Sequence, residues 1–119
     1  MLVAFNINLA TRRLDIGRAV AAAVRASSGG LPHVKAMALL LADRGLVQVS
    51  MNLTMVDETP MDVVFEAVAR EAARHGVAVA ESEVVGLVPA AALGQATAEQ
   101  LQIAAWQPSM VLETRLPPD

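Results

Sequence analysis

Cysteine and tyrosine are both missing from this sequence of 119 residues, which contains one tryptophan and two phenylalanines. Without cysteine the chain can form neither disulfides nor thiolate metal sites, and no other metal-ligand pattern is visible, so we expect no bound metal. So few aromatic residues cannot build a platform on which bases stack. The net charge of −3 also argues against a nucleic-acid partner, because nucleic acids normally select a basic face.

Long hydrophobic runs are missing too. The longest, residues 36–42, is far short of the ~20 apolar residues that cross a bilayer. Met1 is followed directly by apolar residues without a basic leader, so no signal peptide is predicted. Together with the lack of cysteine, which fits a reducing compartment, these features predict a cytoplasmic protein that binds no membrane. The length is typical of one domain, and we expect residues 1–119 to form a single one.

Four segments have the pattern of β-strands. Residues 2–9 and 46–55 alternate between apolar and polar side chains, which is typical of strands with one buried face. Residues 34–42 and 77–88 are apolar for most of their length. A tight loop at residues 43–45 joins the second and third segments, which predicts a hairpin.

Two segments have the spacing of amphipathic helices. One runs from Asp15, its expected N-cap, to residue 27. In the other, Thr59 is the expected N-cap, Pro60 suits the first helical position, and Asp62 completes an acidic variant of the capping box. These signals predict where each helix begins.

The order of these elements is β-α-β-β-α-β, which defines an α/β (α+β) protein. The simplest packing with right-handed crossovers is a ferredoxin-like split β-α-β sandwich with a four-stranded antiparallel sheet. Two helices then cover one face of the sheet, the other face is open, and the first and third strands lie side by side in the centre. A short helix at residues 89–93 and weaker helical and extended segments up to residue 115 predict a C-terminal helical extension.

Amide side chains are concentrated on the central strands, at the positions that face away from the helices. The polar positions are Asn6 and Asn8 on the first strand and Gln48, Ser50, Asn52 and Thr54 on the third. Asparagine is a poor strand residue because its amide competes for local backbone hydrogen bonds. Amides both donate and accept hydrogen bonds, as a heteroaromatic or peptide-like ligand requires. We therefore predict a ligand site or a subunit interface here, and the alternative is an ordinary solvated face.

Three further residues are candidates for the same site. Lys35 could balance a ligand carboxylate, Glu83 could accept a hydrogen bond from a ring N–H, and Gly86 could admit close approach of the backbone. The alternatives are a solvated lysine, a solvated edge carboxylate and a bulge. His33 and His75 have no evident serine, cysteine or second histidine partner, so no catalytic residue is predicted.

Four strings resemble the second half of the formiminotransferase domain of glutamate formiminotransferases. They are FNINL at residues 5–9, VKA at 34–36, QVSMNLT at 48–54 and SEVVGLVP at 82–89. The tail also resembles the end of bacterial members, at residues 101–102, 111–113 and 115–116. The resemblance runs nearly end to end and preserves spacing as well as composition.

The resemblance implies a function. Enzymes of this family transfer a formimino group between N-formiminoglutamate and tetrahydrofolate during histidine degradation. Their domain consists of two similar β-α-β-β-α-β halves that hold folate in a tunnel between them. The chain would then bind tetrahydrofolate through Asn6, Asn8, Lys35, Gln48, Ser50, Asn52, Glu83 and Gly86.

The family's general-base histidine belongs to the first half, and neither His33 nor His75 lies at a matching place. Three interpretations follow. The chain is a half that needs a separate N-terminal formiminotransferase half, or a stand-alone relative that forms a homodimer and binds a ligand without catalysis, or an unrelated ferredoxin-like module such as an amino-acid-sensing domain.

Overall fold

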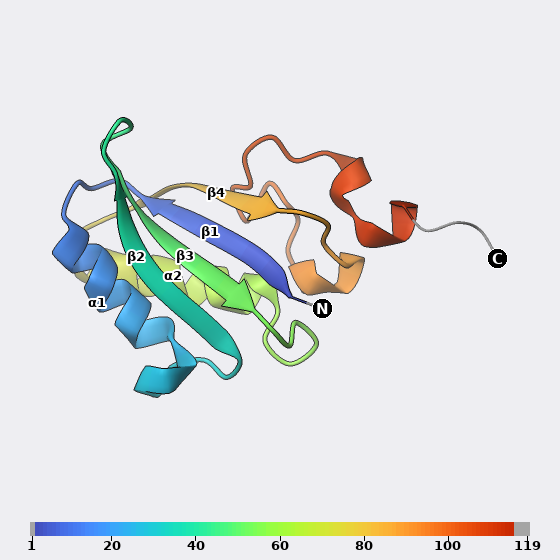
Figure 1. The fold of residues 1–119 in the computed structure, drawn as a ribbon, viewed down its shortest axis with the longest axis horizontal. Coiled ribbons are helices and arrows are strands. Elements are labelled where there is room, and N and C mark those ends of the chain that lie inside the picture. The colour runs from blue at the N-terminus through green and yellow to red at the C-terminus, as the bar shows by residue number, and fades with distance from the viewer. Residues whose placement is uncertain (1, 116–119) are drawn as a thin grey trace.

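A computed structural model describes residues 2–115, with side chains up to residue 113 (Figure 1). The main elements are β1 (Val3–Leu9), α1 (Leu14–Val24), β2 (Val34–Leu41), β3 (Leu46–Leu53), α2 (Met61–Arg74) and β4 (Val79–Val85). Short 3₁₀ turns follow at Ala90–Leu93, Pro108–Met110 and Leu112–Arg115. This order confirms the predicted β-α-β-β-α-β succession, and the C-terminal extension consists of 3₁₀ turns instead of α-helix.

The four strands form one antiparallel sheet in the order β2-β3-β1-β4. This is the order of a ferredoxin-like split β-α-β fold, with β1 and β3 in the centre as predicted. Both helices cover the same face of the sheet (Figure 1). The described residues contain no helix that is long and apolar enough to cross a membrane.

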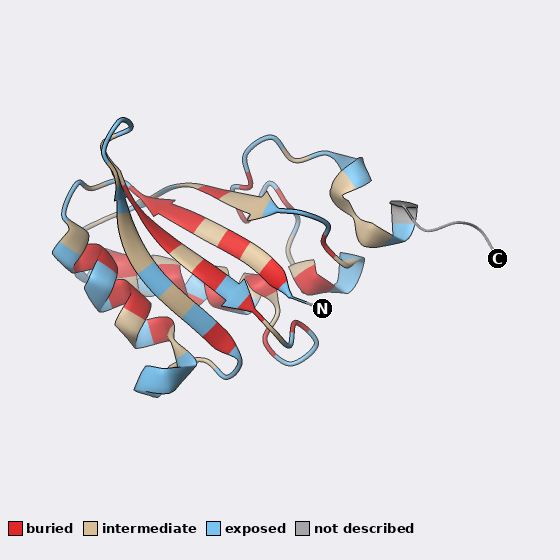
Figure 2. Ribbon diagram, in the orientation of Figure 1, coloured by how far each residue is buried: buried red, intermediate tan, exposed pale blue. Residues whose placement is uncertain are grey.

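The core lies between the helices and the sheet. Every second side chain of β1 and β3 is buried there (Figure 2). Phe5 is fully buried, as are Ile7, Val49 and Met51 on the same face of the two strands. Burying each such side chain contributes about 1.5–3 kcal/mol. The alternation predicted from the sequence therefore separates a helix-covered face from a polar one.

Gly17 allows α1 to approach the sheet closely. A Cβ atom at this position would overlap a methyl group of Val47 on β3 and crowd Ala38 on β2. Glycine in a helix interior usually costs about 1 kcal/mol relative to alanine. At this position the missing side chain instead makes room for helix–sheet contact.

The predicted start of α1 was wrong. The N-cap is Arg13 with no side-chain cap, and α1 ends at Val24 before a 3₁₀ turn at Ala26–Ser28. Asp15 lies in the first turn of α1, where its carboxylate accepts a hydrogen bond of 2.7 Å from Arg13 Nη2. Asp15 is therefore an acidic residue of the first helical turn and not the N-cap.

The predicted start of α2 was also wrong. Pro60 occupies the N-cap position and no side chain caps the helix. Thr59 is buried and donates its hydroxyl to the Pro32 carbonyl at 2.7 Å. Asp62 accepts backbone N–H groups from Val63 at 2.9 Å and from Gln95 at 3.0 Å. Both capping residues therefore hold segments distant in sequence against the start of α2.

The fourth strand is shorter than the predicted 77–88, because the chain turns at Gly86, where φ is +88°. The outer edge of β4 contacts the C-terminal extension through parallel bridges from Ser82 to Ile103 and, beyond the strand, from Val88 to Val111. Leu116, part of the tail that resembles the family, lies outside the described residues.

Candidate ligand-binding face

The side chains that point away from the helices form what we call the open face. Strand pairing arranges twelve of them in three rows, because residues directly opposite each other share one face of a sheet. The hairpin row is Leu39, Gln48, Asn8 and Glu81; the middle row is Met37, Ser50, Asn6 and Glu83; the outer row is Lys35, Asn52, Ala4 and Val85.

The structure therefore brings seven of the eight predicted site residues onto one face. Asn6, Asn8, Gln48, Ser50 and Asn52 lie on the central strands, Lys35 lies on β2 and Glu83 on β4. Two exposed apolar side chains flank the polar centre, Met37 at 61% and Val85 at 62% exposure. Met37 on β2 and Val85 on β4 lie on opposite edges of the sheet, so they border the polar centre as single apolar residues and do not form one patch.

Exposure differs sharply between the rows. Asn8 and Gln48 in the hairpin row are only 1% and 7% exposed, although they face away from the helices. Asn6 and Ser50 are half-buried, and Asn52 is exposed. The hairpin row is thus internally packed, and the outer row is the accessible part of the face.

The buried amides are paired with carboxylates on β4. Asn8 Nδ2 donates to Glu81 Oε1 at 3.1 Å, and Asn6 Nδ2 donates to Glu83 Oε1 at 3.0 Å. Gln48 Nε2 donates to Asn8 Oδ1 at 3.0 Å and to Glu83 Oε1 at 3.2 Å. Leaving such buried groups unpaired would cost about 1–3 kcal/mol each. The pairing accounts for amides on a sheet face and fixes their orientation.

Glu81 and Arg44 extend this network, and neither was among the predicted site residues. Arg44, in the loop between β2 and β3, forms an ion pair with Glu81 on β4. Hydrogen bonding from Arg44 lowers the pKa of Glu81; burial opposes this effect, and the Asn8 amide lowers the pKa further. The alternation of Glu81 with Glu83 was the available sequence signal, whereas nothing in the sequence links Arg44 to β4.

The lowered pKa predicts an acid dependence of stability. Because the folded-state pKa of Glu81 is below the unfolded value of about 4.3, its contribution is present above that value and is lost as pH falls through the folded pKa. We expect wild type to exceed Glu81→Gln in unfolding free energy by up to about 1 kcal/mol near neutral pH. Urea denaturation across the acid range should show this gap closing. A gap that persists unchanged in strong acid would contradict the assignment, and Arg44→Gln should reproduce the trend.

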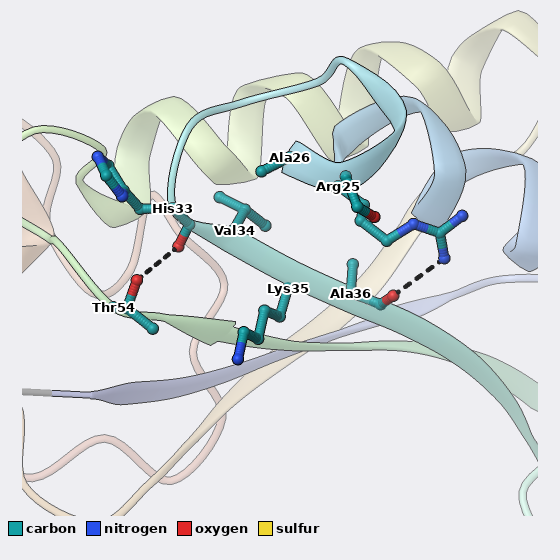
Figure 3. A pocket seen from close by; sticks show the side chains of 8 residues that line it. Arg25, Ala26, His33, Val34, Lys35, Ala36 and Thr54 are labelled. Atoms are coloured by element: carbon teal, nitrogen blue, oxygen red, sulfur yellow. Dashed lines mark hydrogen bonds between the residues drawn. The ribbon is translucent and has the colours of Figure 1, made fainter.

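The outer row borders two hollows. A small one of about 150 Å³ is lined by Lys35, Ala36, Met37, Ser50 and Asn52. A larger one of about 570 Å³ lies at the edge of β2 (Figure 3) and is lined by Arg25, Ala26, Ser27, His33, Val34, Lys35, Ala36 and Thr54. There Arg25 Nη1 donates to the Ala36 carbonyl at 3.4 Å. Lys35 belongs to both hollows and can therefore contact a ligand in either one.

Gly86 and the two histidines lie outside the rows. Gly86 has a φ of +88°, and nothing lies within 4 Å of where its Cβ would be. The backbone conformation alone therefore explains why glycine occupies this position. A role for Gly86 in ligand approach stays a prediction. His33 Nε2 lies 2.8 Å from Glu58 Oε2, a partner that sequence reasoning missed, and exposed His75 is the C-cap of α2.

Comparison with known proteins identifies the family. Residues 4–109 match the model of the formiminotransferase domain. The chain is 44% identical to the glutamate formimidoyltransferase of Thermoplasma acidophilum over 115 residues, which is 97% of this chain and 38% of the relative. The corresponding enzyme of Streptococcus pyogenes is 43% identical over 102 residues, covering 86% of this chain and 34% of the relative. The formimidoyltransferase-cyclodeaminase of Sus scrofa is 39% identical over 103 residues, covering 82% of this chain and 19% of the relative.

This chain therefore belongs to the formiminotransferase domain family. The predicted resemblance is confirmed, and the interpretation as an unrelated ferredoxin-like module is excluded. The chain spans little more than a third of the glutamate formimidoyltransferases that it matches, and about a fifth of the formimidoyltransferase-cyclodeaminase.

Proposed function

We propose that this chain is the tetrahydrofolate-binding half of a glutamate formimidoyltransferase. In this role it holds the folate while a formimino group is transferred between N-formiminoglutamate and tetrahydrofolate. Family membership supports the reaction class, and the amide-lined open face is the observation that supports folate binding.

The free polar groups of the open face complement a reduced pterin. Within residues 2–115, no hydrogen bond reaches Glu83 Oε2 or Gln48 Oε1, so both remain available as acceptors. Asn52 and Lys35, in the outer row, supply donors. A reduced pterin presents ring N–H, amino and carbonyl groups in one plane, and a folate also carries carboxylates that a lysine can balance.

A second sheet is expected to cover this face. The family resemblance implies two similar halves with folate between them, and the chain spans only 38% of the Thermoplasma relative. Met37 and Val85 flank the polar rows with more than half of each side chain exposed. Covering them would remove apolar surface from water and would also exclude water from the ligand.

The chain's contribution is binding and orientation. General acid–base help is worth roughly 10²–10⁴-fold in such reactions, and neither histidine lies in the rows of the open face. His33 is paired with Glu58, and His75 lies at the end of α2. A separate N-terminal half is the proposed source of the base.

The alternative is a non-catalytic module that self-associates through the same face. The exposed Met37 and Val85 are equally consistent with this alternative, because a second copy could cover them as well as a different half could. Analytical ultracentrifugation at tens of micromolar distinguishes the two: a stable two-fold dimer that binds folate supports the homodimer, and a monomer that dimerises only with a first half supports the proposal.

Removing the Asn52 amide should weaken folate binding without unfolding the protein. We expect Asn52→Ala to cost about 1–3 kcal/mol of binding free energy, because a ligand polar group loses its partner in a covered site. Asn52 is exposed, and its side chain forms no hydrogen bond among the described residues, so the variant should keep the wild-type fold.

The measurement is calorimetric titration with 5-formyltetrahydrofolate in the presence of the first half of a related enzyme. Ser27→Ala is the matched control, because Ser27 lines the larger hollow at the edge of β2 and not the open face. If Ser27→Ala weakens binding and Asn52→Ala does not, the ligand occupies that hollow and the proposed site is wrong.

A further inference from the structure

The outer edges of β2 and β4 differ in what covers them. On β4, the Ser82 N–H donates to the Gln102 carbonyl and the Ala104 N–H donates to the Ser82 carbonyl, both at 2.8 Å. The C-terminal extension therefore pairs with this edge. No segment of the described residues pairs with the outer edge of β2. An uncovered edge presents unpaired backbone groups to which a further strand can be added.

The backbone of β2 is regular enough to accept such a strand. Its pairing with β3 runs along the whole strand without a bulge. The Thr54 N–H donates to the His33 carbonyl at 3.2 Å, which fixes the phase of the hydrogen bonds between the two strands. Because these bonds alternate in an antiparallel pair, Ala36, Ala38 and Leu40 point their N–H and C=O groups away from β3. An added strand would pair with these outward groups.

Two arginines lie beside this edge. Arg25, the C-cap of α1, donates from Nη1 to the outward carbonyl of Ala36 at 3.4 Å (Figure 3). Arg18 lies about two turns earlier on α1, and both arginines line a hollow of about 350 Å³ with Met37 and Ala38. The larger hollow of Figure 3 continues along β2 and shares Arg25. We call these two hollows together the β2 trough.

The β2 trough is positively charged, although the chain as a whole has a net charge of −3. Arg18, Arg25 and Lys35 line it, and none of them pairs with a carboxylate among the described residues. His33 also lines it and is already paired with Glu58. No aspartate or glutamate lines either hollow. Elsewhere, the arginines that pair with carboxylates of this chain are Arg13, Arg44, Arg70 and Arg74. An acidic partner would supply the countercharges that the trough lacks.

We infer that the outer edge of β2 is a docking site for an extended acidic segment of a partner protein, which adds to the sheet as a fifth strand. Its backbone pairs with the outward groups of Ala38 and Leu40, and its carboxylates meet Arg18 and Arg25. Acidic residues at alternate positions suit this site, because alternate side chains of a strand point to the same face. Neither arginine lies on the open face, so docking here does not depend on folate binding.

Other occupants fit the edge less well. Two copies that pair through β2 about a two-fold axis would bring the same arginines of both copies together, and like charges oppose association. A nucleic acid could bind the arginines, but its phosphates only accept hydrogen bonds and would leave the outward carbonyls of Ala38 and Leu40 unpaired. The remaining alternative is that the cations have no partner and only keep the edges of separate copies apart.

The test uses ¹H–¹⁵N spectra of the full 119-residue chain and a pair of synthetic peptides with capped ends. One peptide alternates glutamate with threonine over about eight residues, the length of β2, and the other has lysine in place of glutamate. The glutamate peptide should shift the backbone amide signals of Ala36, Ala38 and Leu40. At saturation it should slow hydrogen exchange at Ala38 and Leu40 about 10-fold or more. The lysine peptide should do neither, and added salt should weaken binding of the glutamate peptide.

The double variant Arg18→Gln with Arg25→Gln should weaken binding of the glutamate peptide about 10-fold. Arg70→Gln with Arg74→Gln is the matched control, because it removes the same charge from exposed positions of α2 and should leave binding unchanged. The inference is overturned if the glutamate peptide does not bind, or if the lysine peptide or a single-stranded oligonucleotide binds equally well. Wild type that dimerises through β2 without peptide would identify a second copy as the occupant instead. Wild type that binds neither peptide, with self-association of the Arg18→Gln and Arg25→Gln variant, would show that the cations only protect the edge.

Discussion

Formimino transfer is expected only when this chain is combined with a first half of a related enzyme, such as that of the Thermoplasma acidophilum glutamate formimidoyltransferase. The chain alone should show no transfer above background, because the first half is the proposed source of the base, whose help is worth roughly 10²–10⁴-fold. The first half is also the proposed second wall, which would exclude water from the folate. Combining the halves should supply both, so the expected increase in rate is at least of that order.

The assay follows tetrahydrofolate and N-formiminoglutamate by mass spectrometry, with each half alone as a control. His33→Gln and His75→Gln should have no effect in the combined preparation, since neither side chain lies in the rows of the open face. Full activity of the chain alone, lost on changing either histidine, would show that the catalytic base belongs to this half.

Phe5→Ala should produce the largest loss of stability in the chain, about 3–5 kcal/mol. Phe5 is fully buried on the helix-covered face of β1, opposite Met51 on β3 and Val84 on β4. Truncation removes a large apolar surface and leaves a cavity in a sheet centre that cannot collapse freely. Folate contacts should be unaffected in whatever fraction remains folded.

Asn52→Ala is the control for this prediction and should change the unfolding free energy by less than about 0.5 kcal/mol. Urea denaturation of both variants measures the difference. Equal losses from Phe5→Ala and Asn52→Ala would mean that the two faces of the sheet have been assigned the wrong way round.

The faces of the sheet could be predicted from the sequence because strand side chains alternate with a period of two. Phe5 and Asn6 are neighbours in the chain and lie on opposite faces, and Val49 and Ser50 repeat the pattern on β3. Once the helix positions are known, this alternation decides which residues are buried. The topology followed from the order of elements and the short hairpin loop.

The start of α2 could not be predicted, because its expected capping residues have partners elsewhere in the fold. The Thr59 hydroxyl bonds the Pro32 carbonyl, and the Asp62 carboxylate bonds the Gln95 backbone N–H. Local sequence rules consider only the helix itself, whereas these partners are brought close by the tertiary fold. Gly17 is another case, since its reason is the nearness of Val47 on β3.

The polar network was likewise only half predictable. Amides on β1 and β3 stand out by composition, but their hydrogen-bond partners depend on strand register. Register places Glu81 beside Asn8, and the hairpin loop places Arg44 beside Glu81. The sequence therefore indicated where polar residues gather, and the structure showed that part of this polarity is satisfied internally.

Folate is proposed to bind to the open face, between this chain and a second half. The most direct measurement is a set of backbone ¹H–¹⁵N spectra of the labelled chain, titrated with 5-formyltetrahydrofolate in the presence of an unlabelled first half. Folate should shift the signals of Asn6, Ser50, Asn52 and Glu83, while those of the exposed surfaces of α1 and α2 stay in place. Shifts confined to the helices or to the hollow around Arg25, with the strands of the open face unchanged, would contradict it.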